Sequence, residues 1–137
     1  MVKILIVEDE DELRNALRRT LEMNGYEVTL ASDGRQGLEE IASNKPDIVL
    51  TDIFMPGMEG LETIRTLATK YPELPVVVMT GSLDPLFIEL SLRFGALKGL
   101  NKPFSADELF MTIEKALARE ANGIMAGEQG VSPEKSC

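Results

Sequence analysis

The chain has 137 residues, of which 44% are hydrophobic, and a formal net charge of −9, as expected of one globular domain with its own core. The negative charge argues against binding to nucleic acid or to an anionic membrane, because both require a basic face. Histidine is absent and Cys137 is the only cysteine, which excludes classical zinc sites, Ser/His/Asp triads and an intrachain disulfide.

Short apolar runs alternate with longer stretches of helical periodicity along the chain. We expect strands at residues 3–7, 26–31, 47–51, 76–79 and 97–101. We expect helices at residues 11–24, 34–43, 58–70, 86–94 and 105–120, the last opened by a capping box of Ser105 and Glu108. Residues 121–137 carry no periodic stripe, so we expect a folded domain over 1–120 and then a disordered tail or the start of a linker.

Strands that alternate with helices predict a parallel sheet covered on both faces. The first, third and fourth runs are uniformly apolar and should be central, whereas the second is more polar and should lie at an edge. The pattern therefore predicts an α/β fold of the flavodoxin-like (βα)5 type, a doubly wound five-stranded parallel sheet in the order 2-1-3-4-5.

Polar residues follow four of the apolar runs, and the carboxyl ends of parallel strands share one edge. Asp52 is the proposed nucleophile, because an ionised carboxylate attacks phosphorus without a general base. Glu8 and Asp9 would join it in holding Mg²⁺ through hard oxygen ligands. The Thr80 hydroxyl and the Lys102 ammonium would contact the phosphoryl group. Together they predict phosphoryl transfer onto Asp52.

The acidic run at residues 8–12 has a second interpretation, because acids are favoured at helix N-termini. Asp9 or Asp11 could cap the first helix. We assign Glu10, Asp11 and Glu12 to the helix start, and Glu8 and Asp9 to the metal.

Four motifs occur in order: "ILIVEDE" at 4–10, "DIVLTDIFMPGMEGLETI" at 47–64, "VVVMTG" at 76–81 and "NKPF" at 101–104. With these motifs the chain resembles a response-regulator receiver domain of two-component signalling, over about residues 2–120. The resemblance implies that a sensor histidine kinase or a histidine phosphotransfer protein phosphorylates Asp52, and that a downstream effector protein or domain responds. It also implies no turnover of a separate substrate, so we do not expect an enzyme.

The resemblance further implies that the side chains of Glu8, Asp9 and Asp52, with the backbone carbonyl of Phe54, bind Mg²⁺. It implies that Thr80 and Lys102 sense the phosphoryl group, and that the peptide bond between Lys102 and Pro103 is cis.

One position departs from the family pattern. Receivers usually carry tyrosine or phenylalanine three residues before the lysine, where this chain has Gly99. The usual switch therefore lacks its aromatic ring, and the alternative is a pseudo-receiver, an interaction module whose output does not depend on phosphate.

The helix at 86–94 is apolar nearly all round, although a helix has only one face to bury. We expect some of its side chains to stay exposed as a partner surface, or as a homodimer surface shared with 97–101 and 105–120. A tighter core around this helix is the alternative.

Other classes on the same fold fit less well. A flavin mononucleotide protein needs a loop that cradles phosphate after the first strand, where this chain has five acids. Aspartate-based phosphatases carry a second aspartate at the place of Phe54. No apolar stretch approaches the roughly 20 residues of a membrane span, and the N-terminus does not resemble a signal peptide. We expect a cytoplasmic protein.

Overall fold

The computed structural model describes residues 1–53 and 60–121, with side chains described as far as residue 118. Strands and helices alternate throughout this part of the chain. The strands are β1 (Lys3–Val7), β2 (Glu27–Ala31), β3 (Ile48–Asp52), β4 (Val76–Thr80) and β5 (Lys98–Asn101). The helices are α1 (Asp11–Glu22), α2 (Gly34–Asn44), α3 (Gly60–Lys70), α4 (Leu86–Phe94) and α5 (Ala106–Ala121).

The strands form one parallel sheet in the order β2-β1-β3-β4-β5, which confirms the predicted fold class and strand order. All residues of β3 and β4 are buried, as the uniformly apolar runs predict for central strands. The registers pair Asp52 with Met79 and Thr80 with Asn101, so the chain leaves these strands at a common level.

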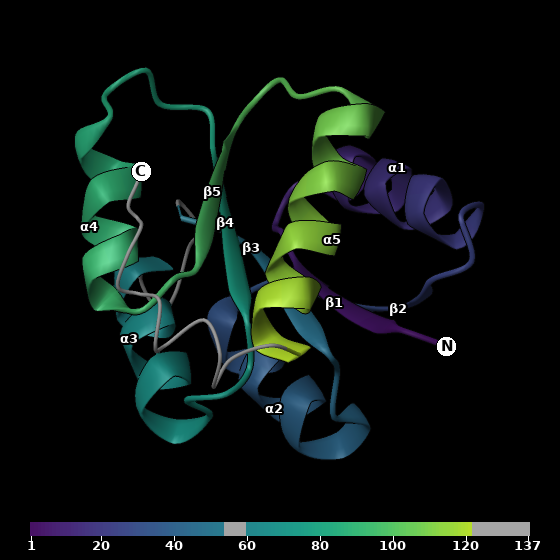
Figure 1. Ribbon diagram of the computed structural model, residues 1–137, viewed down its shortest axis with the longest axis horizontal. Coiled ribbons are helices and arrows are strands. Elements are labelled where there is room, and N and C mark those ends of the chain that lie inside the picture. Colours follow the sequence, from purple (N-terminus) through teal and green to yellow (C-terminus); the bar gives the residue numbers. More distant parts are fainter. Residues whose placement is uncertain (54–59, 122–137) are drawn as a thin grey trace.

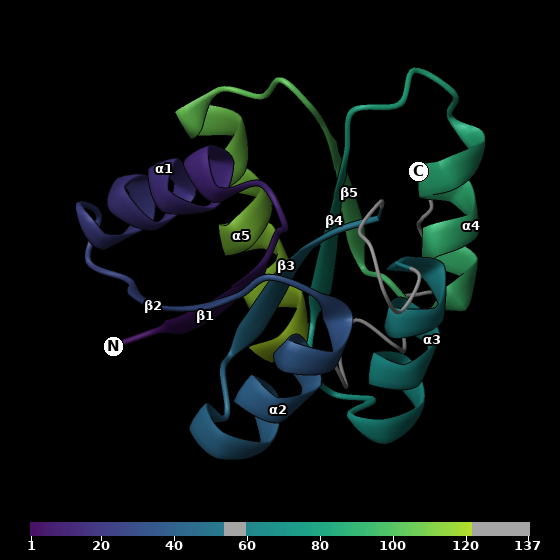
Figure 2. The same cartoon turned by 180° about the vertical axis from the view of Figure 1, so that it is seen from behind.

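Helices cover both faces of the sheet, with α1 and α5 on one side and α2, α3 and α4 on the other (Figures 1 and 2). Alternate strand residues point to opposite faces, so each strand supplies both core clusters. Ile4 and Ile6 pack toward α1 and α5, whereas Leu5 and Val7 pack toward α2 and α3. The sheet is therefore buried on both faces. The loops at the ends of its strands are the accessible places for chemistry.

The strand ends differ slightly from the predicted ones, and the difference matters for the site. β3 extends one residue further, to Asp52, and β4 extends to Thr80, so both residues are held in the sheet ladder. The capping box is confirmed: the Ser105 amide donates to the Glu108 carboxylate at 2.9 Å, and the Glu108 amide donates to the Ser105 hydroxyl at 3.0 Å. The predicted start of the third helix at residue 58 lies outside the described residues.

Helix α4 is poorly covered by the rest of the fold. Ser91 is its only buried residue, while Leu86 and Leu92 are 46% and 44% exposed. This confirms that part of the apolar surface at 86–94 stays exposed, and it contradicts the alternative of a tighter core. Among the described residues, no helix is both long enough and apolar enough to span a bilayer.

The start of α3 packs directly on the backbone that follows β3. A Cβ atom built on buried Gly60 would lie 1.7 Å from the carbonyl oxygen of Ile53. We predict that Gly60→Ala lowers the free energy of unfolding by at least about 2 kcal/mol, because backbone cannot yield as a flexible side chain does. Gly81→Ala is the control, since a Cβ atom on Gly81 meets nothing within 4 Å. Equal urea midpoints for the two variants would contradict this packing.

Candidate functional site

Asp52 is positioned by the carboxyl end of the central strand β3. The Ile53 amide donates to the Met79 carbonyl at 3.1 Å, so the backbone on the far side of Asp52 is still held against β4. The Thr51 hydroxyl donates to the Asp52 carbonyl at 3.1 Å. The Asp52 side chain is nearly buried at this edge, which gives a carboxylate with little freedom to move.

Glu8 and Asp9 follow β1 at the same edge of the sheet. Glu8 is buried, its amide donates to the Ala31 carbonyl at 3.0 Å, and its carboxylate accepts the Glu10 amide at 3.1 Å. Asp9 is exposed. The side-chain oxygens of Glu8, Asp9 and Asp52 lie within 4.8 Å of one another, as the sequence predicted for a set of metal ligands.

Lys102 joins the acids from the end of β5. Its ammonium donates to the Asp52 carboxylate at 2.7 Å and to the Glu8 carboxylate at 3.0 Å. Its backbone amide donates to the Thr80 carbonyl at 2.7 Å, and the bond to Pro103 is cis, as the family resemblance implied. The contact with Glu8 was not predicted from sequence, since nothing in the spacing indicates which acid the ammonium reaches.

The burial of the cluster changes the proton affinities of its members. Burial, and then the charge of Asp52, raise the pKa of Glu8 from 4.5 to about 7, although the Glu10 amide and Lys102 oppose the rise. Burial alone would lower the pKa of Lys102, but hydrogen bonds to Asp52 and Glu8 raise it above its usual value. The ammonium therefore stays charged between the two acids.

The three carboxylates form a donor set that suits a hard divalent cation. Magnesium prefers carboxylate and carbonyl oxygens and keeps several waters, so a partly open set of three acids fits it. The fourth predicted ligand, the backbone carbonyl of Phe54, lies outside the described residues. A cation here would also offset the repulsion that raises the pKa of Glu8.

Thr80 is buried at the end of β4, and its hydroxyl begins a chain of hydrogen bonds that leads to α4. The Ser82 amide donates to the Thr80 hydroxyl at 3.0 Å, and the Asp84 amide donates to the Ser82 hydroxyl at 3.1 Å. The Leu86 amide, the first of α4, donates to the Asp84 carboxylate at 3.0 Å. Figure 1 shows this loop running from the end of β4 to the start of α4. The structure thus relates Thr80 both to Lys102 and to the exposed helix.

The space next to Gly99 is occupied by the side chain of Ile88, which belongs to α4. A Cβ atom built on Gly99 would lie 2.7 Å from Cγ2 of Ile88. Gly99 is paired with Val78 in the β4–β5 ladder, two residues before Thr80. An aromatic side chain at this strand position would collide with α4 as it now packs.

Glu10, Asp11 and Glu12 form the start of helix α1, as assigned from the sequence. Its N-cap is Glu10, which makes no side-chain capping bond, so neither Asp9 nor Asp11 is the cap. Instead, the Arg14 guanidinium reaches back from the helix and donates to the Glu8 carbonyl at 2.8 Å. Nothing in the sequence indicates this contact of Arg14, because it depends on the path of the loop between β1 and α1.

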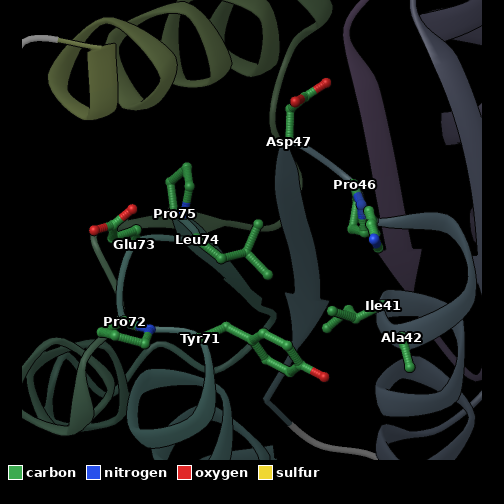
Figure 3. Close-up of a pocket in the computed structure, with 10 residues that line it drawn as sticks. Ile41, Ala42, Pro46, Asp47, Tyr71, Pro72, Glu73, Leu74 and Pro75 are labelled. Atoms are coloured by element: carbon green, nitrogen blue, oxygen red, sulfur yellow. The ribbon is translucent and has the colours of Figure 1, made fainter.

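A separate hollow of about 780 Å³ lies at the opposite edge of the sheet, where β3 and β4 begin. Its wall includes Ile41, Tyr71 and Leu74, and Figure 3 shows the Tyr71 ring pointing toward Ile41 and Ala42. The acid cluster is at the carboxyl ends of the strands, so this hollow is not part of the candidate site.

We predict that the metal-free protein loses stability as pH rises from about 4.5 to about 7. The unfolded Glu8 carboxyl has its ordinary pKa of 4.5, while the folded one has a pKa of about 7, so the folded chain binds the extra proton in this window. The Glu8→Gln variant leaves Asp52 and Lys102 in place. It should reduce the fall in the free energy of unfolding between these pH values by roughly 1–3 kcal/mol, as measured by urea unfolding with a chelator present. If the free energy of unfolding depended on pH in the same way in wild type and variant, the raised pKa of Glu8 would be contradicted.

Known proteins resemble this chain in sequence and in fold. The family model described as response regulator receiver domain matches residues 4–114. The response regulator MprA of Mycolicibacterium vanbaalenii is 41% identical over 127 residues, which cover 93% of this chain and 55% of MprA. MprA of Mycobacterium ulcerans is 41% identical over 118 residues, covering 86% of this chain and 51% of that protein. The chain thus spans about half the length of the curated relatives it matches.

Solved structures agree with the family match. A response regulator receiver domain protein from Clostridium thermocellum is 32% identical with a TM-score of 0.83, covering 88% of this chain and 98% of that one. The receiver domain of NtrX from Brucella abortus is 33% identical with a TM-score of 0.81, covering 84% of this chain and 98% of that one. A family match over most of the sequence, on the same fold, means that the chain belongs to the response-regulator receiver domains of two-component signalling.

Proposed function

We propose that Asp52 accepts a phosphoryl group from the phosphohistidine of a sensor histidine kinase or a histidine phosphotransfer protein. The observation that carries this proposal is the convergence of Asp52 with Lys102 and two further acids at one edge of the sheet. A carboxylate oxygen of Asp52 attacks phosphorus, the P–N bond of the donor breaks, and the imidazole keeps the electron pair. The product is an aspartyl phosphate.

Each side chain of the cluster has a defined task in this transfer. The Lys102 ammonium, now 2.7 Å from the Asp52 carboxylate, would follow the negative charge onto the phosphoryl oxygens. The Thr80 hydroxyl would donate a hydrogen bond to the same group. Glu8, Asp9 and Asp52, with the Phe54 carbonyl, would hold Mg²⁺, which supplies charge compensation when bound.

The output follows from the connection between Thr80 and α4. A Thr80 hydroxyl that turns toward a phosphoryl group would disturb the bond from the Ser82 amide, and with it the turn that starts α4. The exposed Leu86 and Leu92 make this helix the proposed contact surface for an effector protein or domain, or for a second copy of the chain through α4, β5 and α5. We place the functional domain at residues 1–120 and a linker or tail after it.

The second candidate function is a pseudo-receiver with an output that does not depend on phosphate. The Ile88 side chain above Gly99 favours it, because no aromatic ring can enter that space while α4 packs as it does. The intact cluster of Asp52, Lys102 and the two acids opposes it, since a module without phosphate chemistry has no need of these buried charges.

We predict that a small phosphodonor with Mg²⁺ adds one phosphoryl group to the protein and none to Asp52→Asn. The variant keeps the shape of the side chain but loses the nucleophilic oxygen. Intact-mass spectrometry measures the addition, and Asp47→Asn is the control at the start of β3, far from the cluster. Equal phosphorylation of Asp52→Asn and wild type would refute the assignment.

We also predict that beryllofluoride, a mimic of the phosphoryl group, shifts the backbone amide resonances of Ser82, Asp84 and Leu86. These amides form the hydrogen-bond chain that begins at Thr80. Thr80→Val lacks the hydroxyl and should show much smaller shifts at the same amides. Binding of the mimic without any change at these amides would favour the pseudo-receiver.

A further inference from the structure

We propose that Arg14 is a positioning residue of the magnesium site, which it serves by holding the backbone carbonyl of Glu8. This inference rests on the proposed function, because it concerns the acids proposed to bind the metal. The Arg14 guanidinium donates to the Glu8 carbonyl at 2.8 Å and also pairs with the Asp11 carboxylate. The Arg14 side chain is only 15% exposed, so it is held against the loop and not free in solvent.

With the bond from Arg14 to its carbonyl, Glu8 is held at its backbone amide, its carbonyl and its side chain. The Glu8 amide donates to Ala31, and its carboxylate accepts bonds from Lys102 and from the Glu10 amide. The carbonyl bound by Arg14 is in the same rigid peptide plane as the amide of Asp9. Holding that plane sets where the Asp9 side chain begins, and Asp9 is the exposed member of the ligand set.

Local helix energetics do not explain an arginine at this position. Arg14 is in the first turn of α1, where the positive end of the helix dipole disfavours a cation. Its pairing with Asp11 offsets that cost only weakly, because the Asp11 side chain is 81% exposed. The bond to the Glu8 carbonyl is the contact that ties Arg14 to the site.

Charge and position make opposite predictions for metal binding. If Arg14 acted only as a nearby positive charge, its removal would strengthen the binding of Mg²⁺ to the acids. If it positions the loop between β1 and α1, its removal would weaken that binding, as loss of supporting contacts does at other metal sites. The sign of the change therefore separates the two roles.

The test is isothermal titration calorimetry, in which Mg²⁺ is added to the unphosphorylated 137-residue chain. We expect Arg14→Met to raise the Kd for Mg²⁺ about tenfold. Arg19→Met is the matched control, because it removes the same charge from an exposed position on the same helix, and its Kd should stay within about twofold of wild type. Arg14→Lys keeps a donor and should give an intermediate Kd. A Kd for Arg14→Met equal to or below that of wild type would overturn the inference.

A second measurement separates positioning from general loss of structure. With a small phosphodonor, Arg14→Met should need more Mg²⁺ for half-maximal phosphorylation but reach the wild-type maximal rate. A lower maximal rate at an unchanged Mg²⁺ requirement would overturn the inference. If Arg14→Met does not fold, Arg14→Lys decides: a raised Kd supports the role, and an unchanged Kd overturns it.

The two proposals fail in different ways. Only the role of Arg14 is overturned if wild type binds Mg²⁺ and accepts phosphate on Asp52, while the Arg14→Met variant binds Mg²⁺ equally well. Wild type that binds no Mg²⁺ overturns both.

Discussion

The ammonium of Lys102 between two nearly buried carboxylates is the interaction on which the site depends. Three strands must end at one level to make it, since Glu8 follows β1, Asp52 ends β3 and Lys102 follows β5. An isolated buried ion pair contributes little to stability, because desolvation cancels much of the attraction. The raised pKa of Glu8 is consistent with this cost, because burial first and the charge of Asp52 second favour the protonated form despite the nearby ammonium. The cluster sets three carboxylate side chains, those of Glu8, Asp9 and Asp52, beside one ammonium, and such a set suits the binding of a cation.

Backbone hydrogen bonds fix the edge of the sheet where the proposed chemistry would take place. Ladder hydrogen bonds hold Asp52 and Thr80 inside strands, and the Lys102 amide binds the Thr80 carbonyl at 2.7 Å. The fixed backbone keeps the carboxylates of the cluster close together although they repel one another. Such preorganisation is the main contribution that a protein makes to phosphoryl transfer. In the loop between β1 and α1, the bond from the Glu8 amide to the Ala31 carbonyl is supplemented by side-chain bonds from Arg14 and Lys102.

Sequence alone predicted the strand order and the meeting of Glu8, Asp9, Asp52 and Lys102, because both follow from the alternation of apolar runs and from the shared direction of parallel strands. It did not predict the bond from Arg14 to Glu8 or the second partner of Lys102, since these depend on loop paths and side-chain rotamers. The assignment of Glu10, Asp11 and Glu12 to the helix start was confirmed, but the sequence did not indicate which acid is the N-cap, because acids occupy several neighbouring positions and Glu10 makes no side-chain capping bond. Hydrophobic patterns in the sequence predict the helices and strands, whereas the side-chain contacts between them depend on how these elements pack.

The packing of Ile88 against Gly99 limits how the proposed signal could leave the site. The side chain of Ile88 on α4 occupies the space next to Gly99, since a Cβ atom at this position would lie 2.7 Å from Cγ2 of Ile88. Movement of a ring on β5 cannot be the message in this chain. The remaining covalent and hydrogen-bonded path from Thr80 to α4 is the loop at Ser82 and Asp84, whose bonds end at the first amide of the helix. Helix α4 has one buried residue, Ser91, and it exposes Leu86 and Leu92, so the loop that begins at Thr80 ends at a helix that the fold covers only in part. Under the proposed function, a change in that loop would reach an exposed apolar surface without an aromatic switch.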